Sequence, residues 1–152
     1  VINLQGDLPF INPNYVNKVK EILQQDDDVD ISTLATKFVD NDSIENESKV
    51  KIAYNLNAND KFLRAIYFSR YKIPYGANIF YEHIGIYGFR RNSLEKFVNL
   101  PISNLESMEK LEQLRALDQN MVIKFTEVSD SPIAIDIPDD IIRLEEKLSS
   151  LL

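Results

Sequence analysis

The sequence contains no cysteine, only one histidine, His83, and only four glycines. The absence of cysteine excludes disulfide bonds, thiolate metal sites and cysteine nucleophiles, so any chemistry must come from oxygen and nitrogen groups. Basic residues are also few, with 17 lysines and arginines against 24 aspartates and glutamates, which gives a formal net charge of −7. Because nucleic-acid affinity depends on clustered basic residues, this balance argues against a nucleic-acid partner, and any nucleotide partner should be a small molecule held with a cation.

No apolar run approaches the length of a membrane span, and no basic region precedes an apolar one at the N-terminus. We therefore expect a cytoplasmic protein with no membrane attachment. The chain has 152 residues, of which 44% are hydrophobic, and this suits one domain over residues 1–152 better than two. Val1 stands directly inside an apolar run with no polar lead-in, which indicates truncation at the N-terminus.

Strand and helix patterns alternate along the chain, with a strand pair between them. Asn12-Pro13 supplies a helix cap and a first-position proline, and apolar residues then recur at helical spacing to about residue 24. From residue 49 to 56 apolar and polar residues alternate, which places Lys49 and Lys51 on an exposed strand face. The pattern predicts an α/β domain with a mixed sheet and an inserted hairpin. The expected strands cover residues 1–4, 31–38, 49–56, 62–69, 83–89 and 121–128.

Two later segments have the spacing of a helix capping box, in which Ser, Thr or Asn is followed three residues later by Glu. They begin at Asn92 and Ser103, and each should start a helix. The second helix is expected to continue to about Asp118. Its buried stripe would consist of Met108, Leu111, Leu114 and Leu117.

Two short acidic motifs lie near opposite ends of the chain. Asp7 closes Gln5-Gly6-Asp7 after the first expected strand, and Asp136 opens Asp136-Ile137-Pro138-Asp139-Asp140 ahead of the last expected helix. Open α/β sheets bind ligands beyond the carboxyl ends of their strands. If the fold brings the two aspartates together, they can hold one Mg²⁺, which takes one or two carboxylates and fills its other positions with water and phosphate oxygens. The alternative is that both are exposed turn or helix-end residues.

Three further motifs lie between these two acidic ones. In chain order the five are Gln5-Gly6-Asp7-Leu8-Pro9, Tyr67-Phe68-Ser69-Arg70 with Ile73-Pro74, His83-Ile84-Gly85-Ile86-Tyr87-Gly88-Phe89-Arg90, Leu111-Glu112-Gln113-Leu114-Arg115 and Asp136-Ile137-Pro138-Asp139-Asp140. Together they resemble the 3-deoxy-manno-octulosonate cytidylyltransferases, or CMP-Kdo synthetases, across the whole chain. The Gln-Gly-Asp motif alone would be a weak signal, whereas the strand with His83 and the run from Leu111 to Arg115 are hard to obtain together by chance.

This resemblance implies a Rossmann-like nucleotidyltransferase fold with a mixed, mostly parallel sheet, and a homodimer. It implies that the anomeric hydroxyl of Kdo attacks the α-phosphorus of CTP, which releases pyrophosphate and gives CMP-Kdo for lipopolysaccharide synthesis. It further implies that Asp7 and Asp136 hold Mg²⁺. The implied sugar-pocket residues are Gln5, Arg70, His83, Tyr87, Glu112 and Gln113.

Each sugar-pocket candidate also has a purely structural interpretation. A lone histidine in a strand is more often a satisfied structural residue, and Tyr87 could be a core aromatic. Arg70 suits a carboxylate, because a guanidinium binds it with two parallel hydrogen bonds, but a surface salt bridge is an equal alternative. Glu112 and Gln113 lie off the apolar stripe of their helix, and both could be solvated.

The sequence also departs from the family pattern. Leu8 stands where the family usually has Glu, and Ala134, Ile137 and Asp139 replace Gly, Thr and Glu in the last motif. The family's N-terminal strand and basic CTP-binding loop have no counterpart, so we expect this chain alone to be inactive. Two alternatives stay open. One is a folded remnant without activity, and the other is a related enzyme such as a CMP-sialic acid synthetase, which fits the His83 motif less well.

Overall fold

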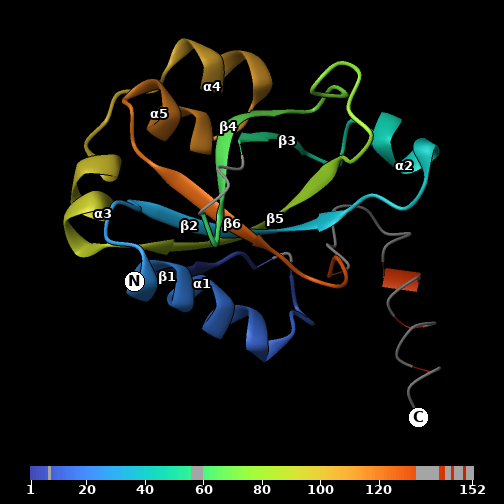
Figure 1. Ribbon diagram of the computed structural model, residues 1–152, viewed down its shortest axis with the longest axis horizontal. Coiled ribbons are helices and arrows are strands. Elements are labelled where there is room, and N and C mark those ends of the chain that lie inside the picture. The colour runs from blue at the N-terminus through green and yellow to red at the C-terminus, as the bar shows by residue number, and fades with distance from the viewer. Residues whose placement is uncertain (7, 56–59, 133–140, 143–144, 146–148, 150–152) are drawn as a thin grey trace.

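A six-stranded sheet in the order β1-β5-β2-β6-β4-β3 forms the centre of the computed structural model (Figure 1). The structure describes residues 1–6, 8–55, 60–132, 141–142, 145 and 149. At one end of the sheet β3 also pairs with β5, so that the sheet curls back on itself. The strands are β1 (Ile2–Leu4), β2 (Ile31–Lys37), β3 (Lys51–Asn55), β4 (Leu63–Ser69), β5 (Tyr81–Phe89) and β6 (Ile123–Glu127).

The sheet is mixed, as predicted, but it is not mostly parallel. Within the described residues only β2 and β6 pair in parallel, and every other pairing is antiparallel. The expectation of a mostly parallel sheet is therefore wrong for this part of the chain. The connection between β3 and β4 is one reason. It spans only residues 56–62, which is too short for a parallel pair, because a parallel pair needs a crossover of about a dozen residues or more.

Helices cover both faces of the sheet (Figure 1). On one face α1 (Pro13–Gln25) packs Tyr15 and Val19 against the sheet residues Leu34 and Ile86. Its N-terminus is capped by Asn12 as predicted, since the Asn12 side chain accepts a hydrogen bond from the backbone N–H of Asn14 at 3.0 Å. The other face carries α3 (Arg91–Val98), α4 (Asn104–Glu109) and α5 (Gln113–Asp118), and the short α2 (Asn41–Glu45) lies at the edge.

The single helix expected from Ser103 to Asp118 is in fact two helices, α4 and α5. The capping box of Ser103 and Glu106 forms as predicted, but Lys110 ends α4 in the left-handed conformation, with φ 58° and ψ 41°. Met108, which a continuous helix would bury, is therefore 75% exposed. Leu111, which precedes α5, and Leu114 within it are buried, as expected.

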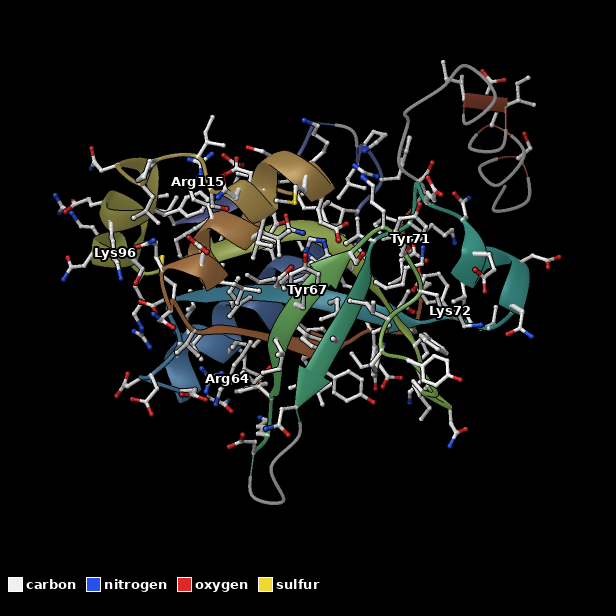
Figure 2. The ribbon with its side chains drawn as sticks, turned by 90° about the horizontal axis from the view of Figure 1, so that it is seen from above. Arg64, Tyr67, Tyr71, Lys72, Lys96 and Arg115 are labelled. Atoms are coloured by element: carbon white, nitrogen blue, oxygen red, sulfur yellow. The ribbon has the colours of Figure 1, made fainter. Side chains whose placement is uncertain are left out.

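Arg115 of α5 ties the two helices together. Its Nε and Nη2 donate to the two carboxylate oxygens of Glu106 in α4, at 2.8 and 2.6 Å. The same guanidinium lies over the ring of Phe97 in α3, 5.3 Å from its centroid, so that it sits among all three helices (Figure 2). This pair holds the residues after Lys110 in a fixed orientation, and Glu112 and Gln113 are among them.

Two other local expectations are wrong. The capping box expected from Asn92 does not form, because α3 begins at Arg91 and Ser93 instead donates its hydroxyl to Asp30 at 2.7 Å. Lys51, expected on an exposed strand face, is completely buried. Its Nζ donates to the backbone carbonyls of Asn46, Lys49 and Arg70, at 2.7, 2.8 and 2.6 Å. Three carbonyls satisfy the three ammonium protons, and burial lowers the pKa of Lys51.

Candidate active site

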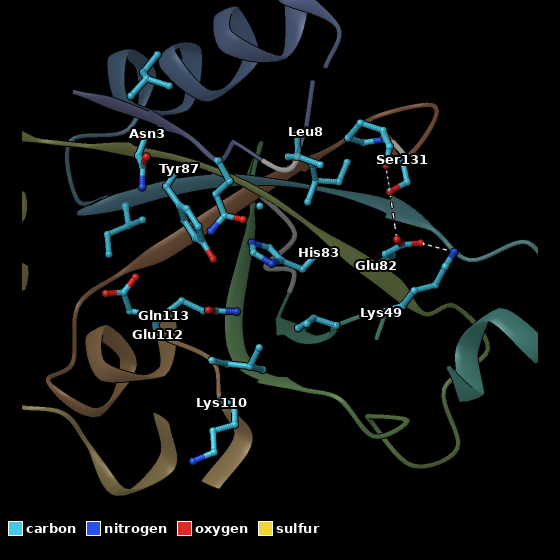
Figure 3. A pocket seen from close by; sticks show the side chains of 18 of the residues that line it. Asn3, Leu8, Lys49, Glu82, His83, Tyr87, Lys110, Glu112, Gln113 and Ser131 are labelled. Carbon is cyan, nitrogen blue, oxygen red and sulfur yellow. Dashed lines mark hydrogen bonds and ion pairs between the residues drawn. The ribbon is translucent and has the colours of Figure 1, made fainter. Parts of the chain in front are cut away.

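A cavity of about 1240 Å³ lies between β5, the residue that follows β1, the segment before β3, and the junction of α4 with α5 (Figure 3). Its volume exceeds the usual range of ligand pockets, about 300–1,000 Å³, so it has room for a sugar and part of a second substrate. The fold brings all six sugar-pocket candidates to this cavity. They are Gln5, Arg70, His83, Tyr87, Glu112 and Gln113.

A bulge in β5 shapes the cavity wall. Between Ser32 and Leu34 the register of β2 jumps from Gly88 to Ile84 on β5, so residues 85–87 stand opposite Thr33 alone. Such bulges bend a strand and redirect its side chains, and they are frequent beside active sites. Tyr87 lies in this bulge and His83 just before it, and the two side chains reach the cavity side by side (Figure 3).

Gly85 lies in the bulge and makes room for Gln5. A Cβ atom at position 85 would clash with Oε1 of Gln5 and would lie 3.0 Å from its Cδ, which is tighter than most real Cβ contacts. Glycines in strands often mark bulges or close approaches of another group, and Gly85 meets both descriptions. The absence of a side chain there lets the Gln5 amide pack across β5 at the edge of the cavity.

Three side chains contact the His83 ring. Its Nε2 lies 3.0 Å from the hydroxyl of Thr33, and its centroid lies 5.1 Å from that of Phe68, in a T-shaped arrangement, and 5.3 Å from that of Tyr87, with the rings tilted. Burial lowers the pKa of His83 to about 3, so the imidazole is neutral at neutral pH. Burial, and secondarily the charge of Glu112, raise the pKa of Tyr87, which is therefore a neutral phenol.

Glu112 and Gln113 are adjacent in sequence but differ in environment. The Glu112 side chain is 67% exposed and lies 3.6 Å from Arg115, so the solvated alternative describes it well. Gln113 is only 6% exposed and lines the cavity below His83 (Figure 3). Within the described part of the chain no hydrogen bond satisfies the Gln113 amide. A buried polar group without a partner costs about 1–3 kcal/mol, which a ligand hydroxyl would offset.

Arg70 follows β4 and is oriented by backbone oxygens. Its Nε donates to the carbonyl of Glu109 at 3.2 Å, and its Nη1 donates to the carbonyl of Glu47 at 3.1 Å. The Glu109 carboxylate instead accepts from the Ser69 hydroxyl at 2.9 Å and from the Arg70 backbone N–H at 3.1 Å. Among residues 1–6, 8–55 and 60–132, no carboxylate forms an ion pair with the guanidinium. Its positive charge is therefore available to an anionic ligand.

Sequence patterns gave no indication of one polar cluster in the cavity wall, formed by Lys49, Glu82 and Ser131. Lys49 forms an ion pair with Glu82 at 3.0 Å, and the Ser131 hydroxyl donates to the other carboxylate oxygen of Glu82 at 3.1 Å (Figure 3). The link depends on the β3–β5 pairing at the end of the sheet, which local sequence patterns do not indicate.

The two metal-ligand candidates, Asp7 and Asp136, lie outside the described residues. Described residues beside each of them, Leu8 near the first and Ser131 and Pro132 before the second, line the same cavity. Leu8, which stands in place of the family's Glu, is 6% exposed in an apolar cluster with Tyr15 and Val19. Elsewhere in the described ranges no group of three or more His, Asp or Glu residues could hold a metal ion.

None of the helices in the described part of the chain combines the length and the apolar character that crossing a bilayer requires.

A family model described as cytidylyltransferase matches residues 1–125. The chain is 42% identical to 3-deoxy-manno-octulosonate cytidylyltransferase of Elusimicrobium minutum, over 93% of this chain and 59% of the relative. It is 43% identical to the enzyme of the same name from Rickettsia felis, over 99% of this chain and 60% of the relative. It thus spans about 60% of the length of these relatives.

A solved structure gives the same result. A CMP:2-keto-3-deoxy-manno-octonic acid synthetase in complex with CTP superimposes with a TM-score of 0.88 at 32% identity, covering 99% of this chain and 62% of the other. The α/β nucleotidyltransferase fold is therefore shared with that enzyme. The resemblance that the five sequence motifs indicated is confirmed, and the chain belongs to the cytidylyltransferase family.

Proposed function

We propose that the protein to which this chain belongs transfers CMP from CTP to 3-deoxy-manno-octulosonate, releasing pyrophosphate and giving the CMP-sugar used in lipopolysaccharide synthesis. The names of the relatives support this activity, and so does the chemistry of the cavity. Kdo is an acidic eight-carbon sugar, so its site needs one group for a carboxylate and several for hydroxyls.

The observation that carries the proposal is that one cavity holds both a buried amide without a hydrogen-bond partner and a guanidinium without a carboxylate, among the described residues. Gln113 is a buried amide with no hydrogen-bond partner in the described part of the chain, and Arg70 is a guanidinium there with no neutralising carboxylate. The Kdo carboxylate would neutralise Arg70, because guanidinium binds carboxylate with two parallel hydrogen bonds. A sugar hydroxyl would satisfy Gln113.

Three of the remaining candidates, His83, Tyr87 and Gln5, offer a polar, uncharged ligand surface, whereas Glu112 is an exposed carboxylate at the cavity wall. His83 and Tyr87 are both neutral at pH 7, so they offer hydrogen bonds without adding charge beside the sugar. Gln5 contributes a second amide at the edge of the cavity. Phosphoryl transfer depends mostly on positioning and on stabilising charge, and these side chains would hold the attacking hydroxyl in one orientation.

Mg²⁺ is the metal that this reaction calls for, and we propose Asp7 and Asp136 as its ligands. When bound, it would neutralise the α-phosphate of CTP and lower the pKa of the attacking hydroxyl. Two carboxylates suit a hard cation that keeps waters and phosphate oxygens as its other ligands. The support from the structure is that Leu8 and Ser131, described residues near each aspartate, line the cavity that holds the sugar candidates.

We also propose a Rossmann-like arrangement for the whole protein, with β3 and β4 as an inserted hairpin, and a homodimer in the cytoplasm, where CTP is found. The antiparallel β3–β4 pairing and the likeness to the CTP complex support the first of these. The chain spans about 60% of its relatives' length, and we expect no turnover from these 152 residues alone.

A titration with Kdo, followed by amide NMR of the ¹⁵N-labelled chain, tests the proposal. We expect shifts at Gln113, Arg70 and His83, and no binding by Arg70→Met because the carboxylate then loses its partner. Lys96→Met removes an exposed cation outside the cavity and should bind like the wild type. Shifts confined to α1, on the opposite face of the sheet, or equal binding of a neutral sugar, would contradict the proposal.

A further inference from the structure

The hydroxyl of Thr33 on β2 contacts His83 and two backbone carbonyls, and these contacts determine which ring nitrogen of His83 carries hydrogen. The side chain is completely buried. Its Oγ1 lies 2.8 Å from the carbonyl oxygen of Ile86 and 3.1 Å from that of Ile84, and 3.0 Å from Nε2 of His83. A hydroxyl has one proton to donate and can accept two hydrogen bonds, whereas a carbonyl oxygen only accepts.

With hydrogen on Nε2 of His83 these atoms make two hydrogen bonds, whereas with Nε2 as the acceptor they make only one. If the Thr33 proton pointed to Nε2, then Oγ1 would face two carbonyl oxygens with no proton between them, in a buried site where unmatched acceptors are costly. If the proton goes to Ile86 or Ile84, then Oγ1 is free to accept, and Nε2 of His83 must carry the hydrogen. The contacts therefore favour one imidazole tautomer over the other.

The bulge in β5 creates this arrangement. Because residues 85–87 stand opposite Thr33 alone, Thr33 has no Cα partner on β5, and its hydroxyl reaches the two carbonyls of the bulge. Phe68 and Tyr87 pack against the His83 ring and hinder a flip that would exchange the two nitrogens. In the described part of the chain no hydrogen bond is made by Nδ1.

We propose that Thr33 is a positioning residue that holds His83 in the neutral tautomer with hydrogen on Nε2, so that Nδ1 accepts a hydrogen bond from a hydroxyl of the sugar. The tautomer follows from the geometry alone, whereas the identity of the donor rests on the proposed function. As an acceptor, Nδ1 repels a carboxylate and attracts a hydroxyl. Thr33 would thereby direct the acidic group of the sugar to Arg70 and away from His83.

The lowered pKa of His83 agrees with this assignment, since a neutral ring can keep one nitrogen free of hydrogen at neutral pH. The sequence has a single histidine, so ¹⁵N spectra of histidine-labelled chain report this ring without overlap. We expect one species between pH 5 and 8, with Nε2 protonated and Nδ1 unprotonated. A protonated Nδ1 in the wild type would overturn the proposal without any variant.

Two variants separate positioning from folding. Thr33→Val keeps the shape but removes the oxygen, so we expect a mixture of tautomers and roughly tenfold weaker Kdo binding, the effect of one hydrogen bond. Thr33→Ser keeps the hydroxyl and should restore the wild-type spectrum. A Thr33→Val spectrum identical to that of the wild type would refute the role of Thr33.

Adding Kdo to the wild type tests separately whether His83 contacts the sugar and whether the cavity binds Kdo at all. We expect the Nδ1 resonance to move, because it gains a hydrogen bond. If Kdo shifts the Gln113 amide but leaves Nδ1 unchanged, the sugar contact of His83 is wrong and the proposed function stands. If Kdo binds nowhere in the cavity, the proposed function fails, whereas the tautomer set by Thr33 is judged by the ¹⁵N spectra alone.

Discussion

Acidification should destabilise this protein through one side chain, His83. Its pKa is about 3 in the fold, against about 6.5 for an unperturbed histidine. Between these two values the unfolded chain binds one more proton than the folded chain. The contribution of His83 to the unfolding free energy is therefore fully present above pH 6.5 and is lost as the pH falls toward 3.

The size of the effect follows from these two pKa values. From pH 8 to pH 5 the unfolded state gains about 2 kcal/mol by protonating the histidine, while the folded state gains almost nothing. Any folded-state pKa below about 4 gives the same result, because the ring then stays neutral at pH 5. Carboxyl groups titrate mostly below this window, so histidine dominates it.

Urea unfolding at pH 8, 6.5 and 5 measures this loss, with His83→Gln as the matched variant. The wild type should lose about 2 kcal/mol of unfolding free energy between pH 8 and 5, and the variant should lose little. The difference between the two pH dependences is the readout, so a constant destabilisation by the substitution does not matter. Equal losses in both proteins would refute a histidine that stays neutral in the folded chain at pH 5.

Three more predictions concern single substitutions. Gly85→Ala should displace the Gln5 side chain and weaken Kdo binding by roughly tenfold, measured by titration, with an altered Gln5 side-chain amide signal. Lys51→Met should lower the unfolding free energy by about 3 kcal/mol, because it removes the ammonium donor from three carbonyls, of which only that of Asn46 keeps a backbone N–H, from Lys49, among the described residues; the exposed Lys96→Met should stay within about 0.5 kcal/mol. Met108→Lys should also change stability by less than about 0.5 kcal/mol in urea unfolding; a loss of 2 kcal/mol or more would indicate a continuous α4–α5 helix.

Elements with local signals were predictable from the sequence. Asn12 and Pro13 predict the start of α1, and Ser103 with Glu106 predicts the start of α4, because a helix cap acts within one helical turn. The end of α4 was not predictable, since Lys110 adopts a left-handed conformation that glycine or asparagine normally marks. The contact of Arg115 with Glu106 stabilises this turn, and it joins residues nine positions apart, beyond the reach of a local cap signal.

Features of the sheet and of the site that depend on long-range strand pairing could not be predicted from the sequence. Alternation placed Lys51 on an exposed face, but β3 is covered where it meets β4 and β5, and the ammonium is buried. The sequence motifs named the six sugar candidates, and all of them reach one cavity. Thr33 carried no signal, because a β-branched residue in a buried strand is expected for packing alone. Its importance depends on the register shift in β5.

The buried ammonium of Lys51 has a consequence for how this molecule opens. It bonds the carbonyls of Asn46 and Lys49 on one segment and that of Arg70 on another, and Glu47 from the first segment also holds the Arg70 guanidinium. Residues 46–49 therefore cannot detach without releasing both cations at once. Amide hydrogen exchange along this stretch and at the end of β4 should follow a single opening event, in which one wall of the cavity comes apart as a cooperative unit.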